Sequence, residues 1–208
     1  MAEQKERTPL YTFARGVFGV LFRTLMPIRY HGTDKLNRQD APYILISNHQ
    51  AAIDPFVLAL PVRRYEIRFI GKREIIGHKL VQWAVTQLHM IPVRRGATDM
   101  GAMRACMSAL KEGHVVGIFP EGTRKLPEMM QTVESGTGMI ALRSGVPIVP
   151  VYIQSKVRPF HVTHVYVGDP MDIADIRAQG MSNDSIQQVC DRIRQTFYTM
   201  RDDANCAK

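Results

Sequence analysis

A histidine and an aspartate lie five positions apart, at His49 and Asp54, just after a short apolar run at residues 43–46. Polar residues that directly follow a strand are typical of functional sites in α/β sheets. If the chain turns back between these two side chains, the carboxylate can keep a proton on one ring nitrogen and leave the other as a base. The spacing alone leaves a second interpretation open, in which Asp54 caps a helix beginning at Pro55 and His49 is an ordinary loop residue.

A second polar group follows the apolar run at residues 115–119. Arg124 can donate two parallel hydrogen bonds to phosphate oxygens, and Gly122 gives the loop backbone freedom. Glu121 would repel a phosphate, so we expect it to orient an arginine or to accept a hydrogen bond from a substrate hydroxyl. The alternative is a tight turn that carries a surface Arg–Glu pair.

Two further segments are weaker signals. The apolar run at residues 90–93 leads directly into Arg94, which makes Arg94 a candidate for binding phosphate, although an arginine pair with Arg95 is also typical of a charged loop. Two prolines bracket the apolar segment at residues 146–150, which suits an edge strand or a pocket wall. That segment has no evident chemistry of its own.

Short apolar runs alternate with helical patterns along most of the chain, which predicts an α/β fold. We expect a single-domain sandwich with a mixed, largely parallel sheet flanked by helices. The expected strands cover residues 43–47, 67–70, 90–93, 115–119, 148–153 and 161–167, and the expected helices begin after Asp99, near Gly136 and around residues 182–184.

The segment at residues 9–28 has the periodicity of a helix with a wide apolar surface and one narrow polar stripe that includes Arg15 and Arg23. The two arginines interrupt it too often for a membrane span, and no secretory signal is convincing. We expect residues 1–29 to form a helical segment lying in the cytoplasmic surface of the membrane, peripheral or monotopic, and residues 30–208 to form the catalytic domain. The alternative is a helix packed on the protein's own core.

Lys and Arg outnumber Asp and Glu by 27 to 19, which gives a net charge of +8 and favours an anionic partner. An anionic membrane, an acidic substrate or carrier, and nucleic acid are the candidates. The basic residues are scattered and not interleaved with aromatic residues, which argues against nucleic acid. The three cysteines are few, odd in number and widely spaced, so we expect reduced thiols.

In their order along the chain, these segments resemble the four sequence blocks of the glycerolipid acyltransferase family. The resemblance runs from about Tyr30 to Asp172 and is greatest to bacterial 1-acyl-glycerol-3-phosphate acyltransferases. The four blocks are Asn48-His49-x4-Asp54, Ile91-Pro92-Val93-Arg94, Phe119-Pro120-Glu121-Gly122-Thr123-Arg124 and Val146-Pro147-Ile148-Val149-Pro150.

The resemblance implies the roles of the residues. His49 would be the general base and Asp54 would orient it, while the acceptor hydroxyl attacks the thioester of acyl-CoA or acyl carrier protein directly. Neither a metal nor another cofactor is implied. The family assigns the acceptor's phosphate to Arg94, Glu121 and Arg124, with Gly122 and Thr123 shaping the loop.

One position departs from the family. Many relatives carry lysine where this chain has Glu134, which would weaken a phosphate role there. Another lysolipid acceptor therefore stays open. Other classes that stay open are a His–Asp hydrolase that uses water on thioesters, and a basic nucleic-acid- or membrane-binding protein without catalysis.

Overall fold

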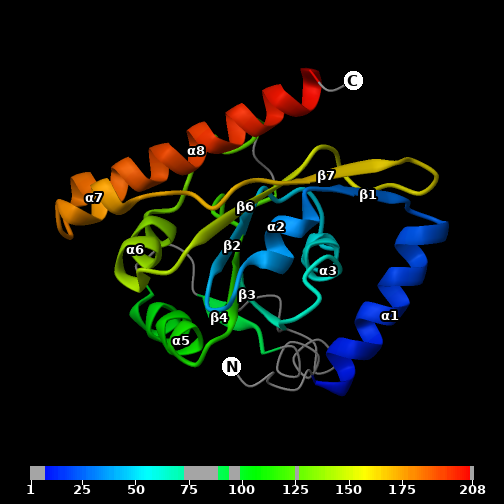
Figure 1. The fold of residues 1–208 in the computed structure, drawn as a ribbon, viewed down its shortest axis with the longest axis horizontal. Coiled ribbons are helices and arrows are strands. Elements are labelled where there is room, and N and C mark those ends of the chain that lie inside the picture. Colours follow the sequence, from blue (N-terminus) through cyan, green and yellow to red (C-terminus); the bar gives the residue numbers. More distant parts are fainter. Residues whose placement is uncertain (1–7, 73–88, 94–98, 125–126, 207–208) are drawn as a thin grey trace.

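The computed structural model describes residues 8–72, 89–93, 99–124 and 127–206. They form a seven-stranded sheet in the order β1-β7-β6-β2-β5-β3-β4, in which β6 and β7 are antiparallel and the other described neighbours are parallel (Figure 1). A mixed, largely parallel sheet was the predicted architecture. The strands are β1 (Ile28–His31), β2 (Ile44–Ser47), β3 (Ile67–Lys72), β4 (Ile91–Val93), β5 (Val115–Ile118), β6 (Ile148–Ile153) and β7 (Thr163–Val167).

Helices cover both faces of the sheet. Side chains of a strand alternate between its two faces, and β2 shows this directly. Ile44 and Ile46 belong to the hydrophobic core shared with α5, α6 and α8, whereas Leu45 belongs to the core shared with α1, α2 and α3. The helices are α1 (Pro9–Thr24), α2 (Thr33–Arg38), α3 (Asp54–Ala59), α5 (Met100–Lys111), α6 (Ser135–Ser144), α7 (Ala174–Ala178) and α8 (Asn183–Cys206).

Local sequence signals explain where the central helices begin and end. The Asp99 carboxylate accepts hydrogen bonds from the N–H groups of Gly101 and Ala102 at 2.9 and 3.0 Å, which caps α5. Gly113 follows the end of α5 and Gly145 follows α6, both with positive φ (80° and 70°) that glycine adopts without strain. The predicted starts of these two helices, after Asp99 and near Gly136, are confirmed.

Three elements of the described part of the chain were not predicted: β1, α2 and α7. Each is short, with four, six and five residues, so no apolar period had room to develop. β1 forms at one edge of the sheet because β7 offers it a parallel partner, with Ile28 opposite Thr163. These elements depend on tertiary contacts more than on their own sequences.

One side of helix α1 packs against α3 and the residues that follow it. Phe18 stacks on Phe56 of α3 with ring centroids 3.8 Å apart. The Arg15 guanidinium donates hydrogen bonds to carbonyls at and beyond the end of α3, at 2.6 Å to Leu60 and 2.9 Å to Val62, and also to Ala59. Arg15 thus faces the protein and binds the carbonyl end of α3, where a cation is favourable.

The opposite side of α1 is apolar and exposed. Phe13 is 69% exposed and Val20 is 65% exposed, and Val17 lies between them on the same face. The interpretation of α1 as a helix packed on the protein's own core is therefore right for one of its sides, whereas contact of the exposed side with a membrane stays a prediction. Within the described residues, no helix is long and apolar enough to cross a bilayer.

Candidate active site

The site lies where the carboxyl ends of three neighbouring strands meet. β2 is in the centre, with β5 on one side and β6 on the other, and all three run in the same direction. The residues that follow β2 and β5 therefore emerge at the same edge of the sheet, as ligand sites in open α/β sheets generally do. The two strongest polar segments of the sequence, at residues 48–54 and 119–124, are brought together by this strand order.

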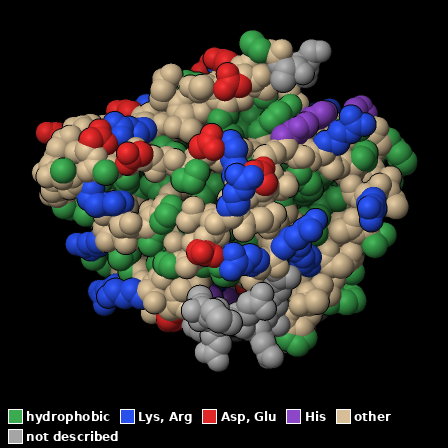
Figure 2. Space-filling view, in the orientation of Figure 1, with side chains coloured by type: hydrophobic (Ala, Val, Ile, Leu, Met, Phe, Trp, Pro, Cys, Tyr) green, Lys and Arg blue, Asp and Glu red, His purple; other side chains and the backbone are tan. Residues whose placement is uncertain are grey.

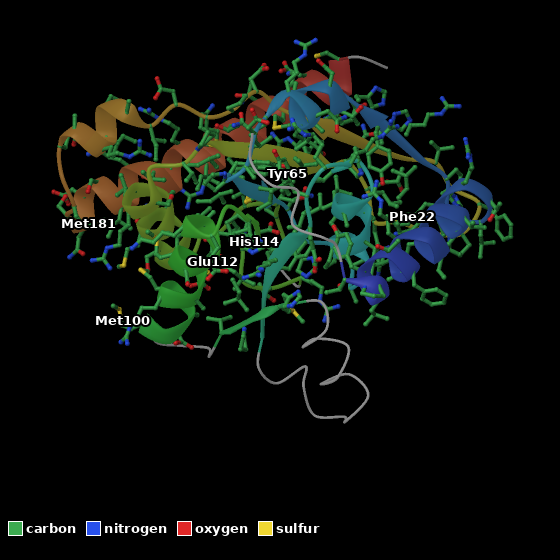
Figure 3. The ribbon with its side chains drawn as sticks, turned by 60° about the horizontal axis from the view of Figure 1, so that its bottom comes forward. Phe22, Tyr65, Met100, Glu112, His114 and Met181 are labelled. Atoms are coloured by element: carbon green, nitrogen blue, oxygen red, sulfur yellow. The ribbon has the colours of Figure 1, made fainter. Side chains whose placement is uncertain are left out.

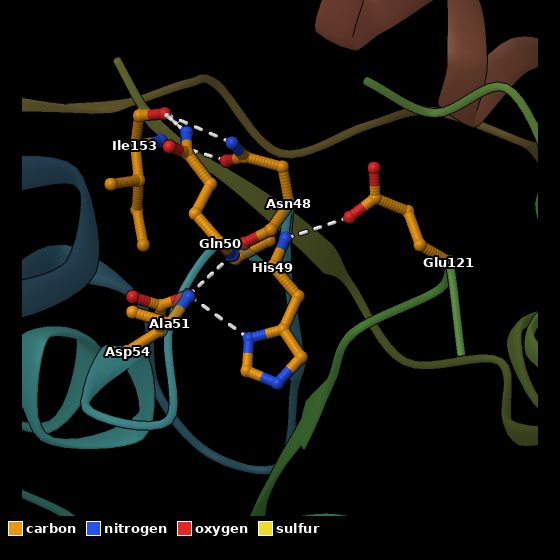
Figure 4. Close-up of polar contacts among 8 residues, drawn as sticks. Asn48, His49, Gln50, Ala51, Asp54, Glu121 and Ile153 are labelled. Atoms are coloured by element: carbon orange, nitrogen blue, oxygen red, sulfur yellow. Dashed lines mark hydrogen bonds and ion pairs between the residues drawn. The ribbon is translucent and has the colours of Figure 1, made fainter. Parts of the chain in front are cut away.

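His49 and Asp54 form a hydrogen-bonded pair. The ring Nδ1 lies 2.9 Å from Asp54 Oδ2, and the Asp54 side chain is fully buried (Figure 4). The same oxygen accepts hydrogen bonds from the N–H groups of Gln50 and Ala51 at 2.7 and 2.8 Å. These contacts fix the carboxylate, and the carboxylate fixes the orientation of the ring.

The alternative in which Asp54 only caps a helix is wrong. Ile53 is the residue at the N-cap of α3, and no side-chain capping bond is formed there. Asp54 instead turns back toward the loop that precedes the helix. The turn between β2 and α3 therefore places the Asp54 carboxylate next to Nδ1 of the His49 ring.

The other ring nitrogen of His49 is available to a substrate. The His49 side chain is 18% exposed, and its ring stacks on Phe119 with centroids 4.0 Å apart. Among the described residues, Nε2 has no hydrogen-bond partner, and His49 lines an open polar pocket. When the Nδ1–H group donates a hydrogen bond to Asp54, Nε2 carries a lone pair and can accept a proton.

Glu121 joins two loops of the site. Its carboxylate accepts hydrogen bonds from the N–H of His49 at 2.7 Å and from the N–H of Met130 at 2.8 Å. The side chain is only 4% exposed, and this burial raises the pKa of the Glu121 carboxyl, while the two N–H donors oppose the rise. The observed contacts make Glu121 a positioning residue; contact with a phosphate or a hydroxyl stays a prediction.

Two amide side chains join the turn that carries His49 to β6. Asn48 and Gln50 both donate to the carbonyl of Ile153, at 2.9 and 2.7 Å, and the Asn48 Oδ1 accepts from the N–H of Ile153 at 2.8 Å. Asn48 is buried, so these bonds also satisfy backbone groups that water does not reach. Asn48 belongs to the predicted block, whereas Gln50 was not singled out.

A pocket of about 350 Å³ opens beside the imidazole. Arg124, one of the predicted phosphate-binding residues, lines it and is exposed. Arg94 follows β4 in the chain but lies outside the described residues, so its predicted role stays a prediction. Lys156 also lines this pocket, and no motif pointed to it. The lining residues are Asn48, His49, Gln50, Glu121, Arg124, Glu128, Met129 and Lys156.

The loop that follows β5 has a backbone conformation at residue 122 that favours glycine. Gly122 has a φ of +61°, and a Cβ added there would lie 2.8 Å from Glu134 Oε1. The N–H of Glu134 donates to the carbonyl of Pro120 at 2.8 Å, so this glutamate is held against the loop. The departure at Glu134 therefore places a carboxylate next to the Gly122 turn, and Thr123 beside that turn is half-buried.

The described residues contain no group of three or more histidine, cysteine or acidic side chains arranged to hold a metal ion. Figure 2 shows lysine and arginine side chains spread over the visible face, with acidic side chains among them. A scattered distribution was expected from the sequence.

A histidine oriented by a buried carboxylate, open to a pocket with cationic side chains, is an arrangement that can activate a hydroxyl group or water. The family model described as Acyltransferase matches residues 27–154. The chain therefore belongs to the acyltransferase family, and it is an O-acyltransferase.

Named relatives agree with this assignment. A 1-acyl-sn-glycerol-3-phosphate acyltransferase of Streptococcus pneumoniae is 27% identical over 197 residues, which cover 91% of this chain and 72% of that protein. A chloroplastic 1-acyl-sn-glycerol-3-phosphate acyltransferase of Brassica napus is 30% identical over 132 residues, which cover 62% of this chain and 38% of that protein. The crystal structure of the 1-acyl-sn-glycerophosphate acyltransferase PlsC from Thermotoga maritima shares the fold, with a TM-score of 0.66, 22% identity and coverage of 94% of this chain and 78% of that chain.

Proposed function

We propose that this chain transfers a fatty acyl group from acyl-CoA or acyl carrier protein to the free hydroxyl of 1-acyl-glycerol-3-phosphate, in phospholipid synthesis. The observation that carries the proposal is the His49 ring, whose Nδ1 lies 2.9 Å from buried Asp54 and whose other face opens to a pocket shared with Arg124. The names of the relatives support this acceptor.

The reaction needs one proton acceptor and no covalent enzyme intermediate. As the acceptor oxygen attacks the thioester carbonyl, its proton passes to Nε2 of His49. The tetrahedral intermediate then collapses, the C–S bond breaks, and the thiolate takes the proton back from the imidazolium. Because a thioester is already activated, positioning the alcohol beside the base supplies much of the remaining rate.

Asp54 serves this step in two ways. Its acceptor contact with Nδ1 keeps the tautomer in which Nε2 is unprotonated, and its charge stabilises the imidazolium that forms. Glu121 holds the His49 backbone from the other side, so the ring is positioned before substrate binds. A site held in place before binding loses less entropy in reaching the transition state.

The acceptor's phosphate belongs in the pocket beside the base. Arg124 lines that pocket, and a guanidinium matches a phosphate with paired hydrogen bonds. We assign Arg94 to the same task from the sequence blocks, with Gly122 and Thr123 shaping the loop. The carboxylate of Glu134 against Gly122 is the observation that keeps another lysolipid acceptor as the second candidate.

We further propose that the exposed stripe of α1 docks on the cytoplasmic surface of an anionic membrane, where lysolipid acceptors reside. Phe13, Val17 and Val20 present apolar surface on one face, which is unfavourable in water and favourable among lipid chains. The net charge of +8 adds attraction to anionic headgroups. In this proposal residues 1–29 attach the chain to lipid and residues 30–208 carry the chemistry.

The decisive experiment is a donor-by-acceptor matrix with purified protein, in which His49→Ala is compared with wild type. We expect acylated product from wild type and none above background from His49→Ala, with unchanged circular dichroism. His31→Ala, on the edge strand β1, is the matched control and should keep full turnover. Turnover by His49→Ala would remove His49 as the base, and thioester loss without acylated acceptor would support the hydrolase alternative.

The role of Arg124 has its own kinetic test. Arg124→Ala should raise KM for the phosphorylated acceptor more than KM for the acyl donor, because it removes a cation from the acceptor's pocket. An unchanged acceptor KM would take Arg124 out of the phosphate site.

A further inference from the structure

Lys156 lies outside every sequence block of the family, yet it lines the pocket that holds His49 and Arg124. It follows β6 by three residues and is exposed. Among the described residues its ammonium group forms no ion pair, although carboxylates line the same pocket. A lysine that has no ion-pair partner among the described residues and lines a pocket is available to bind an anion.

The backbone around Lys156 is held at both ends. Ile153 is bound by the side chains of Asn48 and Gln50, which flank the base. Val157, the residue directly after Lys156, is buried in the hydrophobic core beneath α1 and α3. Lys156 therefore stands on a short segment between two fixed points, which lowers the entropy lost when its side chain binds a ligand.

The two cations come from loops that follow the two strands on either side of β2, the strand that precedes the base. Arg124 follows β5 and Lys156 follows β6, while His49 follows β2, which lies between those strands. In a 1-acyl-glycerol-3-phosphate the free hydroxyl and the phosphate ester are on adjacent carbons. A phosphate bound by these two cations, in the pocket that they share with His49, keeps that hydroxyl near Nε2.

We propose that Lys156 is a substrate-binding residue that pairs, together with Arg124, with the phosphate group of the acceptor. This assignment rests on the proposed function and adds a specificity determinant to it. Two cations from two different loops favour the dianionic monoester over a neutral acceptor, because each contributes a charge-assisted contact that a hydroxyl headgroup cannot replace. They also offset the unfavourable field of Glu128, which lines the same pocket.

The test compares Lys156→Met with Lys156→Arg and with Arg158→Met. Arg158 is exposed, two residues along the same segment and not among the pocket-lining residues, so it is a matched control for loss of one positive charge. We expect Lys156→Met to raise KM for 1-acylglycerol 3-phosphate by about tenfold, the effect of one charge-assisted contact. KM for the acyl donor and KM for monoacylglycerol should stay within about twofold, and Lys156→Arg should restore most of the loss.

A binding measurement separates this proposal from the proposed function. Calorimetric titration with a short-chain 1-acylglycerol 3-phosphate, below its critical micelle concentration and without donor, reports the phosphate contact independently of turnover. Weaker binding by Lys156→Met than by wild type and Arg158→Met supports the assignment, even if wild type acylates a different acceptor. Equal binding by all variants, absence of binding to wild type, or a rise confined to the donor KM would overturn it.

Discussion

Asn48 and Ile153 exchange two hydrogen bonds: the side-chain amide donates to the Ile153 carbonyl at 2.9 Å, and its oxygen accepts from the Ile153 N–H at 2.8 Å. The pair joins the residue before His49 to the last residue of β6, across 105 positions of sequence. An asparagine is suited to this contact because its planar amide presents an N–H donor and a carbonyl acceptor side by side.

Asn48→Ala should weaken both stability and catalysis. It leaves a buried N–H and a buried carbonyl with fewer partners, and each such group costs about 1–3 kcal/mol of unfolding free energy. Urea denaturation measures that loss, and kcat should fall because the turn carrying His49 loosens. Asn48→Asp should be at least as damaging, since a carboxylate oxygen would then face the Ile153 carbonyl. If either variant kept the unfolding free energy of wild type, the two Asn48–Ile153 hydrogen bonds would not stabilise the fold.

Asp54→Asn should reduce kcat by roughly 10²–10⁴ while the acceptor KM changes little. The amide oxygen can take the place of Oδ2 and still accept from the N–H groups of Gln50 and Ala51 and from His49 Nδ1, but the side chain then carries no negative charge. Without that charge, the imidazolium that forms as His49 takes the proton in the proposed reaction is less stabilised, and the transfer slows. Steady-state kinetics measure the effect. Asp40→Asn, on an exposed side chain paired with Arg64, is the control, and a matching loss there would refute a specific role for Asp54.

The raised pKa of Glu121 leads us to expect that the unfolding free energy depends on pH. Its pKa is raised above the usual value near 4.5 mainly by burial, so the folded state holds a proton that the unfolded state has already released. The stability contributed by protonated Glu121 is therefore present at low pH and declines as pH rises from 4.5 through the folded-state pKa. Glu121→Gln lacks this decline and is less stable than wild type, because its NH₂ group opposes one of the two N–H donors.

The measurement is the difference in unfolding free energy between wild type and Glu121→Gln, by urea denaturation from about pH 4.5 to 7. We expect the advantage of wild type to narrow as pH rises. A gap that widened with pH would mean that the backbone donors outweigh burial and that the ionised carboxylate is the favoured form.

The outer stripe of α1 predicts a separable effect on membrane binding. Phe13→Glu/Val20→Glu should abolish co-sedimentation with phosphatidylglycerol-containing vesicles, because both apolar side chains are largely exposed and would have to enter lipid with a charge. Unfolding free energy should change by less than about 0.5 kcal/mol per site, as expected for exposed positions.

The control for this test is Met181→Glu. Met181 is another exposed apolar side chain, and Figure 3 shows it at the opposite end of the molecule from Phe22 of α1. Vesicle binding should survive this substitution. Equal loss of vesicle binding in both variants would mean that net charge causes the attraction to the membrane, since each of the three substitutions lowers the net positive charge of the protein.

Much of the fold follows from local sequence. Asp99 and Gly145 mark the boundaries of α5 and α6 because a cap or a positive φ depends only on near neighbours. Apolar runs bounded by turn residues located β2, β5 and β6 for the same reason. The His49–Asp54 pair was predictable too, since the two residues are only five positions apart in the sequence.

Only the tertiary structure decided which loops meet. Spacing along the chain does not reveal that β2 lies between β5 and β6, because strand order is set by how the two faces of the sheet are covered. That order brings Glu121 to the His49 backbone and Lys156 to the pocket, and the packing of α1 on α3 turns Arg15 toward the protein. The sequence determined the reactive pair, and long-range packing selected the residues that surround it.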